Sequence, residues 1–296
     1  MKPSDIPLAL IVVVIWGLNF IVINIGLQDL PPILFTALRF LLAALPLALF
    51  VKPPPVALRL LVGYALFQFA SQFTLLFYGL HFGFPAGLAS LVMQLQAFFT
   101  IGFAVLFLGE RPRLSQLLGA AVAFSGMALV AAHLEARATL IGFVLVICAS
   151  FCWGVANIFT KKIGKVNPLA LVVWGSVIAT PPLLLSSLVF EGWPAWVLAA
   201  QRLQWRSIGA VLYQAFPNTI IGYGIWSHLM RKYPTATIAP FSLLVPVIGI
   251  LSAAWVVQEP LQWWKLSAGL LVLCGLALNL FGSFLGRRRL PVTRSS

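Results

Sequence analysis

Residues 85–126 read PAGLASLVMQLQAFFTIGFAVLFLGERPRLSQLLGAAVAFSG, and residues 234–275 read PTATIAPFSLLVPVIGILSAAWVVQEPLQWWKLSAGLLVLCG, a constant offset of 149. In this register Leu108-Gly109-Glu110 meets Val257-Gln258-Glu259, and Gly126-Met127-Ala128-Leu129 meets Gly275-Leu276-Ala277-Leu278. An earlier landmark also recurs, as Trp16-Gly17 with Asn19 and as Trp153-Gly154 with Asn157. Each copy carries five apolar blocks, and because five is odd the second copy must cross a membrane in the opposite direction. The sequence therefore predicts an inverted repeat, an architecture typical of transporters.

Composition places the chain in a membrane. Hydrophobic residues make up 61% of its 296 residues and charged residues 8%, and the mean hydropathy of +1.02 excludes a soluble globular protein. The apolar residues form ten blocks of about 20 residues, the length that crosses the hydrocarbon core. The blocks are Ile6–Leu27, Pro32–Val51, Leu60–Phe82, Ala86–Leu108, Leu114–Ala132, Leu140–Thr160, Leu169–Phe190, Ser207–Met230, Thr235–Val257 and Trp264–Leu285. We expect an all-α integral membrane protein of ten transmembrane helices, with a first repeat over 1–134 and an inverted second repeat over 135–296.

The distribution of positive charge predicts the orientation. With a cytoplasmic N-terminus, 14 of the 19 Lys and Arg residues fall inside and 4 outside, and Arg39 falls within a span. The positive-inside rule then places both termini in the cytoplasm. Topology explains the net charge of +13, so we expect anionic lipid and no nucleic acid as its partner. The first span is long and has no clear cleavage site, which indicates a retained helix and not a signal peptide.

The acidic residues and the motifs exclude several kinds of chemistry. All six carboxylates, including Glu110, Glu191 and Glu259, map to loops or span ends, so a proton relay at the bilayer centre has little support unless Glu110 or Glu259 lies deeper. The sequence contains no ATP-binding loop and no catalytic motif. The cysteines and histidines are interpreted as packing and interfacial residues. We expect no enzyme activity, no metal and no cofactor.

Arg39 is the one strong base well inside a span. A charge at mid-helix costs about 2.5–3.5 kcal/mol on insertion scales, so it needs a partner or water. It either faces a cavity and attracts a substrate carboxylate, or it bonds to carbonyl groups of a neighbouring helix or extends toward the interface. Both interpretations stay open.

Polar uncharged residues form stripes at helical spacing on the first, third, fourth, sixth and eighth spans. Amides that faced lipid would lack partners, so these stripes should face the bundle interior. They serve either as contacts between helices or as the lining of a wet central cavity, and five stripes together favour the cavity. The predicted cavity residues are Trp16, Asn19, Arg39, Gln72, Tyr78, Gln94, Gln96, Trp153, Asn157, Asn218, Tyr223 and Ser242.

Prolines mark candidate hinges in the second repeat. Pro181-Pro182, Pro217, Pro240 and Pro246 should interrupt the seventh, eighth and ninth spans, and broken helices at membrane depth mark sites and hinges. We take Pro217, Pro240 and Pro246 as hinge or gate residues, with a static bend as the alternative. Small-residue faces on the fifth span (Gly119, Ala123, Gly126) and tenth span (Ala268, Gly275) indicate close helix packing or dimer contacts. A monomer and a homodimer both remain open.

The chain resembles the EamA family of the drug/metabolite transporter superfamily over essentially its whole length. The residues that carry the resemblance are Trp16 to Phe20, Leu38-Arg39-Phe40, Pro85 to Leu91, Gly109-Glu110-Arg111, Gly222 to Trp226 and Ala239 to Val247. Within the family, Ser90 to Phe99 and Gly222 to Trp226 look most similar to bacterial O-acetylserine/cysteine exporters. The resemblance implies export of amino acids across the bacterial inner membrane, through a cavity between the repeats. One departure is that the second repeat has Gln258-Glu259-Pro260 where the first has Gly-Glu-Arg.

The leading hypothesis is therefore a secondary exporter of amino acids and related metabolites that works by alternating access. Its substrates would resemble cysteine and O-acetylserine, and could include threonine, methionine or aromatic amino acids. The alternative is an exporter of drugs or lipophilic cations, which usually needs a buried carboxylate. A membrane sensor or assembly protein that transports nothing is the third hypothesis.

Overall fold

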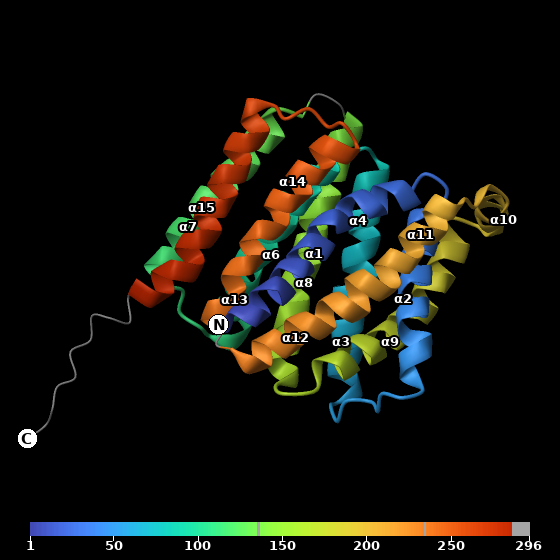
Figure 1. Cartoon of the computed structure of the whole chain (residues 1–296), viewed down its shortest axis with the longest axis horizontal. Helices are drawn as coiled ribbons and strands as arrows, with labels where there is room; N and C mark the ends of the chain where they lie inside the picture. The colour runs from blue at the N-terminus through green and yellow to red at the C-terminus, as the bar shows by residue number, and fades with distance from the viewer. Residues whose placement is uncertain (135–136, 234, 286–296) are drawn as a thin grey trace, which may run out of the picture.

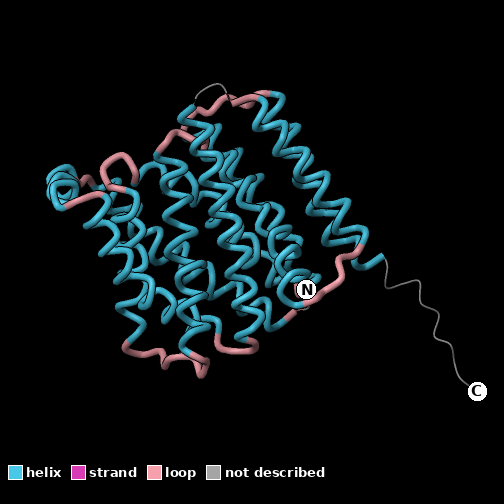
Figure 2. Tube along the Cα trace, turned by 180° about the vertical axis from the view of Figure 1, so that it is seen from behind, coloured by secondary structure: helices cyan, strands magenta, loops and turns pink. Residues whose placement is uncertain are grey.

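A computed structural model describes residues 1–134, 137–233 and 235–285, and in this part every regular element is helical (Figures 1 and 2). The first half begins with a short 3-10 turn at Pro3–Asp5. It continues with α1 (Ile6–Gly26), α2 (Pro32–Ala48), α3 (Leu58–Ala65), α4 (Gln72–His81), α5 (Ala86–Val92), α6 (Gln96–Leu108) and α7 (Leu114–Ala132). The second half contains α8 (Arg137–Ile163), α9 (Pro168–Phe190), α10 (Trp193–Arg202), α11 (Trp205–Tyr213), α12 (Gly222–Lys232), α13 (Thr235–Ile238), α14 (Leu244–Val256) and α15 (Trp263–Leu285).

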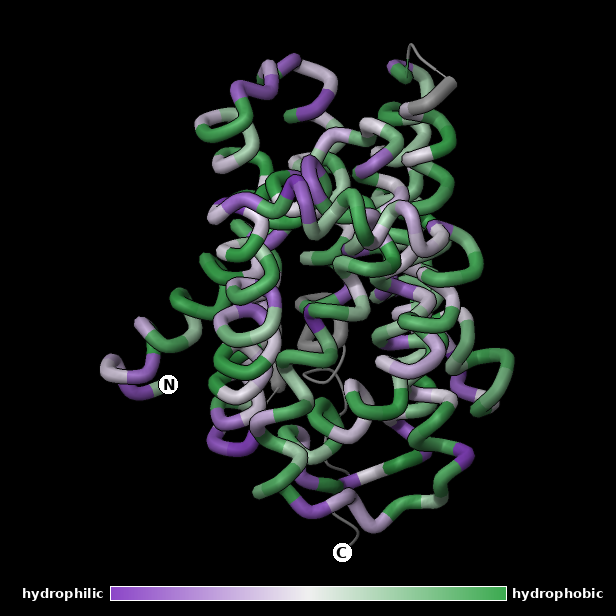
Figure 3. Tube along the Cα trace, turned by 90° about the vertical axis from the view of Figure 1, so that its right-hand side faces the viewer, coloured by the Kyte–Doolittle hydropathy of each residue, from purple (hydrophilic) through white to green (hydrophobic). Residues whose placement is uncertain are grey.

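Seven helical segments of the described chain are long and apolar enough to cross a membrane. They include 58–81 and 86–108, in which two α-helices continue through an irregular turn. Two shorter apolar helices, at 32–48 and 240–256, lie beside them, and 205–232 is helical throughout but less apolar. The predicted spans thus coincide with helical segments, while their total of ten stays a prediction. Figure 3 colours most of the helical length as hydrophobic.

Irregular turns interrupt four segments at matched places in the repeats. Leu66–Ser71 and Gln214–Ile221 are π-helical, and Met93–Leu95 and Ala239–Leu243 are 3-10 helical. The offset of 149 carries Leu66–Ser71 into the second π-helical turn, and it carries Met93–Leu95 onto 242–244, which overlaps the end of the second 3-10 turn. Pro217 and Pro240 lie within two of these turns, as predicted, whereas the turns of the first repeat contain no proline. Pro181 and Pro182 do not interrupt their span, because α9 continues past them unbroken.

The repeat extends to backbone detail at Gly109-Glu110 and Gln258-Glu259, which the offset of 149 relates. Gly109 and Gln258 both have left-handed backbone, with φ of 66° and 56°. The following amides, of Glu110 and Glu259, donate to the carbonyl oxygens of Ala104 and Ala253 at 3.2 Å in each case. Each bond joins residues six positions apart, so both helices end in the same wide turn, one residue longer than the Schellman arrangement. The left-handed conformation costs a residue with a side chain about 1–2 kcal/mol relative to glycine, and Gln258 adopts it although it is not a glycine.

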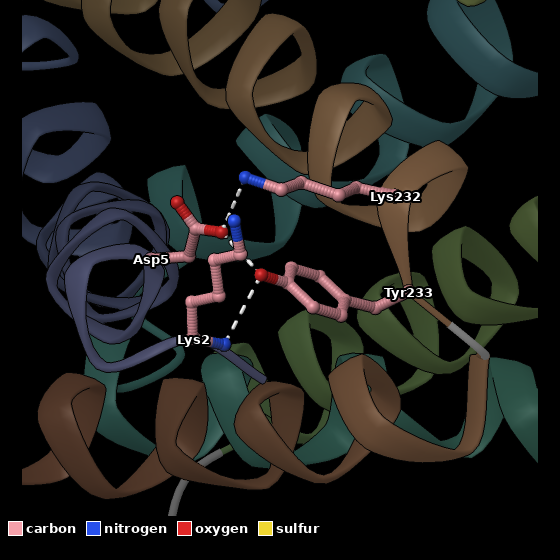
Figure 4. Close-up of polar contacts among 4 residues, drawn as sticks. All are labelled: Lys2, Asp5, Lys232 and Tyr233. Carbon is pink, nitrogen blue, oxygen red and sulfur yellow. Dashed lines mark hydrogen bonds and ion pairs between the residues drawn. The ribbon is translucent and has the colours of Figure 1, made fainter.

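The helices alternate between two faces of the bundle. The N-terminal face is the one at which α1 begins, and the opposite face carries the turn between α14 and α15 (Figure 1). At the N-terminal face Asp5 forms an ion pair with Lys232 at 2.6 Å. Tyr233 donates its hydroxyl to Asp5 and accepts from the backbone amide of Lys2 at 3.1 Å (Figure 4). This cluster holds the start of the chain against the end of α12.

α7 and α15, the last helices of the two halves, pack along each other at one side of the bundle (Figure 1). A Cβ placed on Gly275 would lie 2.4 Å from the carbonyl oxygen of Gly119 and 2.9 Å from the Cβ of Ala123. A Cβ on Gly126 would lie 3.0 Å from the carbonyl oxygen of Ala268. The small-residue faces predicted from the sequence therefore meet within one chain.

We expect Gly275→Ala to destabilise the protein by about 1–3 kcal/mol, because the added methyl group overpacks this contact. Gly102→Ala is the matched control, since a Cβ there meets nothing within 4 Å; it should be neutral or slightly stabilising. Thermal unfolding of both variants in detergent measures the difference. Equal transition temperatures for the two variants would contradict the close approach of α7 and α15.

Candidate functional site

A buried chain of hydrogen bonds joins the two repeats through Arg39. This residue of α2 is fully buried, and its Nε and Nη2 atoms both donate to the hydroxyl oxygen of Thr219 at 3.2 Å. The Thr219 hydroxyl in turn donates to the carbonyl oxygen of Gln214 at 2.8 Å. Both residues belong to the π-helical turn 214–221. The irregular backbone thus supplies the hydroxyl that receives the charged side chain.

Aromatic rings cover the same guanidinium group. Its central carbon lies 3.9 Å from the ring centroid of Phe73 and 4.9 Å from that of Phe40, a cation–π arrangement. The structure therefore does not place Arg39 at the interface, nor on the carbonyl groups of a neighbouring helix. Its Nη1 atom is buried and has no hydrogen-bond partner in the described part of the chain.

Two amide oxygens near this chain of bonds also have no partner. Gln214 donates to the carbonyl oxygen of Asn19 at 3.4 Å and accepts from the side chain of Asn218 at 3.3 Å. The Oδ1 atoms of Asn19 and Asn218 are buried and, among the described residues, unbonded. A free charged donor and two free acceptors are therefore linked through Thr219 and Gln214. Buried polar groups without partners are costly, which indicates a site that a ligand completes.

Aromatic side chains border this polar group. The indole of Trp16 donates to the carbonyl oxygen of Asn218 at 3.3 Å. Its ring centroid lies 5.5 Å from that of Tyr223 and 5.2 Å from that of Trp226. Gly222 allows this approach, because a Cβ there would lie 2.6 Å from the indole nitrogen. Trp16, Tyr223 and Trp226 therefore form one aromatic cluster beside the polar group, and the role of Trp16 and Tyr223 as cavity residues stays a prediction.

The third span contributes two buried amides. Gln68 donates to Gln72 at 3.1 Å, next to the π-helical turn of the first repeat. Gln68 also contacts Tyr223, and Tyr223 lies close enough to Arg39 to interact electrostatically. Gln72 and Tyr223 are thereby connected to the Arg39 group.

A second polar group lies between α6 and α8. The side-chain nitrogen of Asn157 donates to Gln96 at 2.8 Å and to Thr100 at 2.9 Å. These bonds hold the helices together, which is the alternative role that the sequence left open. Gln94 is half-buried within the 3-10 turn 93–95, and Trp153 packs against the hydrophobic core.

The remaining predicted residues lie at other places. Ser242 and Pro240 lie in the 3-10 turn 239–243, and Pro246 lies in the first turn of α14. Tyr78 is near the opposite face, where its hydroxyl donates to Glu191 at 3.5 Å. It borders a hollow of about 610 Å³ between α4 and α9, together with Ser71 and Ser186. Among the described residues, no hydrogen bond joins Tyr78 to the Arg39 group.

Sequence reasoning omitted three residues that the structure brings into the Arg39 group. Gln68, Gln214 and Thr219 belong to the predicted polar stripes, so their spacing was visible, but nothing in the spacing ranked them above Gln94 or Ser242. Their importance depends on the π-helical turn, which changes the direction of side chains within a helix.

The carboxylate of Glu259 is also more engaged than its place after α14 indicated. It accepts a hydrogen bond from the backbone amide of Ala86, the first residue of α5, at 2.8 Å. Burial raises the pKa of this carboxyl group above its ordinary value of 4.5, against the lowering effects of the Ala86 amide, the positive charge of Lys265 and the Gly87 amide. Glu191 caps another helix of the first repeat, accepting from the amides of Ile33 and Leu34 at 2.6 and 2.9 Å.

Comparison with known proteins gives a consistent result. The model of the EamA-like transporter family matches residues 4–132 and 140–281. A probable amino-acid metabolite efflux pump of Salmonella typhimurium is 45% identical over 95% of this chain and 96% of its own, and its namesake in Escherichia coli K12 is 42% identical with the same coverage. A probable terminal-alkyne amino-acid exporter of Streptantibioticus cattleyicolor is 27% identical over 98% and 95%. A solved crystal structure with 18% identity covers 97% of this chain and 99% of its own with a TM-score of 0.61, which supports the fold alone.

Because the pKa of Glu259 is raised, the free energy of unfolding should depend on pH. The folded protein binds the carboxyl proton of Glu259 more tightly than the unfolded chain does. The resulting contribution to the free energy of unfolding is therefore present below pH 4.5 and decreases as pH rises through the raised pKa. Glu259→Gln keeps an acceptor for Ala86 and should remove this term. Thermal unfolding between about pH 4 and about pH 8 measures it. Glu110→Gln, at the matched exposed position, is the control; identical pH profiles for wild type and Glu259→Gln would contradict the assignment.

Proposed function

The chain belongs to the EamA-like transporter family, and we propose that it exports amino acids and related metabolites by alternating access between its two repeats. It is a membrane transporter, and its relatives are named as transporters and not as enzymes. The observation that carries the proposed substrate class is the unpartnered Nη1 of Arg39 together with the free oxygens of Asn19 and Asn218. These groups match the two charges of an amino acid.

The chemistry of the match is specific. The α-carboxylate of a substrate would accept from Arg39, forming a charge-assisted hydrogen bond in a dry site. The α-ammonium group would donate to the amide oxygens of Asn19 and Asn218, and the substrate side chain would lie against Trp16 and Tyr223. Movement of the halves about the turns that contain Pro217 and Pro240, with Pro246 beside the second, would admit the substrate.

The proposed substrates are small amino acids and derivatives similar to cysteine and O-acetylserine, extending to threonine, methionine and aromatic amino acids. The names of the Salmonella and Escherichia relatives support amino-acid metabolites as a class. The aromatic rings of Trp16 and Trp226 would offer an apolar surface to the substrate side chain.

We propose ten transmembrane spans, with the repeats over 1–134 and 135–296, in a bacterial inner membrane with both termini cytoplasmic. The N-terminal face, with Lys161, Lys162, Arg231 and Lys232, would then be the cytoplasmic face. The boundary residues 135–136 and the terminal arginines 287–289 lie outside the described residues. One chain supplies both halves of the Arg39 group, so the site needs no second copy.

Export of lipophilic cations is the second candidate. Such a site needs a carboxylate near the cation. In the Arg39 group, as far as the structure describes it, the charged side chain is the positive guanidinium of Arg39. The observation therefore disfavours cations, and a transport assay decides between the two.

The deciding experiment is transport by the purified protein in liposomes, over a panel of amino acids and one lipophilic cation, with and without a pH gradient. Saturable amino-acid flux without a gradient is the expected result. Flux of the cation alone would favour the second candidate, and absence of any flux would overturn the proposal.

Arg39→Gln should lower amino-acid flux at least tenfold, because a lost charge-assisted bond to the carboxylate costs about 1.5–3 kcal/mol. Arg59→Gln, which removes an exposed positive charge at the start of α3, is the control. Thermal unfolding distinguishes a folding defect from a binding defect. Full flux in a folded Arg39→Gln protein would contradict the role of Arg39.

Gln94→Leu and Asn157→Leu test the second polar group. We expect both to abolish export while the protein still folds, if the half-buried amide of Gln94 and the amide of Asn157 reach the substrate path. Wild-type flux in both variants would limit Asn157 to its contacts with Gln96 and Thr100.

A further inference from the structure

Two carboxylates occupy matched positions in the repeats but have different partners. Glu110 and Glu259 are related by the offset of 149, and each follows a left-handed residue in the same helix-ending backbone. Glu259 is half-buried and bonded to the amide of Ala86 on the other repeat. Glu110 has a side chain 53% exposed and pairs with Lys161 at 2.9 Å. Because the local backbone is the same, the difference comes from how the helices around each carboxylate are placed.

At the opposite face, the segments 86–108 and 235–256 are in close contact beside Glu259. A Cβ on Gly87 would lie 3.2 Å from Ile250 Cα and 3.3 Å from both Ala253 Cβ and Glu259 Oε2. A Cβ on Gly249 would lie 2.4 Å from the hydroxyl oxygen of Ser90. Glu259 thus closes a tight joint between the repeats, and its two amide donors begin the helical segment 86–108.

At the N-terminal face, the matched joint would bring Glu110 to the first turn of the segment 235–256. The offset of 149 carries Ala86 and Gly87 onto Thr235 and Ala236, and Ile250 and Ala253 onto Ile101 and Ala104. Within the part of the chain that the structure describes, Glu110 bonds to Lys161 of α8 instead. The joint is therefore closed at one face and not closed at the other.

Lys161 has no charged counterpart in the first repeat. Gly17 and Gly154 are related by an offset of 137, and they pack on matched residues, Ile248 and Phe99. The same offset carries Lys161 onto Asn24. An amide at this position cannot attract Glu259 as a lysine attracts Glu110. At the opposite face Lys265 interacts with Glu259 electrostatically. Among the described residues, however, the ion pair between a lysine and one of these two carboxylates is the one that Lys161 forms with Glu110 at the N-terminal face.

We propose that Glu110 and Glu259 are reciprocal latches, each binding the first-turn amides of the opposite repeat in one of the two conformations, and that Lys161 withdraws Glu110 and favours the conformation seen here. This proposal rests on the proposed alternating access. In the conformation seen here, the contact between the two repeats would then be open at the N-terminal face. This is the proposed cytoplasmic face, where the substrates are made.

The experiment measures two matched distances by double electron–electron resonance on the spin-labelled whole protein in lipid nanodiscs, without substrate. One pair of spin labels is attached to cysteines that replace Phe82 and Trp255 at the opposite face. The other replaces Leu106 and Arg231, the residues that the offset of 149 relates to them. All four positions are exposed, so the labels leave the joints undisturbed. Cys148, Cys152 and Cys274 are first replaced by alanine.

We expect Lys161→Gln to shift the two populations by about two- to fivefold, the range that an exposed ion pair supports, toward a shorter Leu106–Arg231 and a longer Phe82–Trp255 distance. Glu259→Ala should shift them in the same direction, because it removes the acceptor for Ala86. Lys162→Gln, an exposed lysine beside Lys161, is the control for the loss of charge. Adding Glu110→Ala to Lys161→Gln should reverse the shift, since the released Glu110 forms the second latch and alanine has no side-chain acceptor for the first-turn amides.

Unchanged distances in Lys161→Gln, or an equal change in Lys162→Gln, would overturn the proposal. So would a double variant that keeps the shift of Lys161→Gln. The measurement needs no transport, so a failed flux assay with the expected distance changes would reject the proposed substrates and retain the latches. A single fixed distance for each pair in every variant would reject the two-conformation mechanism itself.

Discussion

The hydrogen bonds between Arg39 and the Thr219 hydroxyl are the interaction on which the interior of this protein depends. A guanidinium group in hydrocarbon must find acceptors within the protein, and an unbroken α-helix has no spare backbone acceptor to offer. The π-helical turn 214–221 meets both needs. Its backbone carbonyl groups accept from the Thr219 hydroxyl and from the indole of Trp16. Its side chains bond to Arg39 and to the backbone of Asn19. The charged residue and the irregular turn require each other, and they come from different repeats.

Much of the fold was accessible from the sequence, because each apolar block is delimited by charges, prolines or glycines. Segments 86–108 and 114–132 agree with the predicted blocks at both ends. The irregular turns could be predicted in part. Pro217 and Pro240 indicate two of them, whereas Leu66–Ser71 and Met93–Leu95 contain no residue that forbids an α-helix. Those two follow from tertiary packing, which local propensity does not contain.

The candidate site was predicted in outline and rearranged in detail. Helical spacing identifies which residues of one helix share a face, such as Gln96 and Thr100, which both accept from Asn157. It does not say at what depth a face meets another helix, so Tyr78 was assigned to a cavity although it bonds to Glu191 near the opposite face. Glu259 was assigned to a loop because no pattern along one segment reveals a carboxylate that caps a helix of the other repeat. The absence of Arg at position 260 fits the finding that Glu110 and Glu259 have different partners.

The pairing of α7 with α15 has a consequence for how the protein is made. Each helix covers a glycine-lined surface of the other, yet the ribosome completes all of α8 to α14 between them. At the usual speed of synthesis, that interval is on the order of ten seconds. During this time α7 lies in the bilayer with the carbonyl groups beside Gly119 facing lipid or an insertion factor. The last helix to enter the membrane is thus the one that completes the packing of the first half, and chains that stop before α15 should be recognised by quality control through α7.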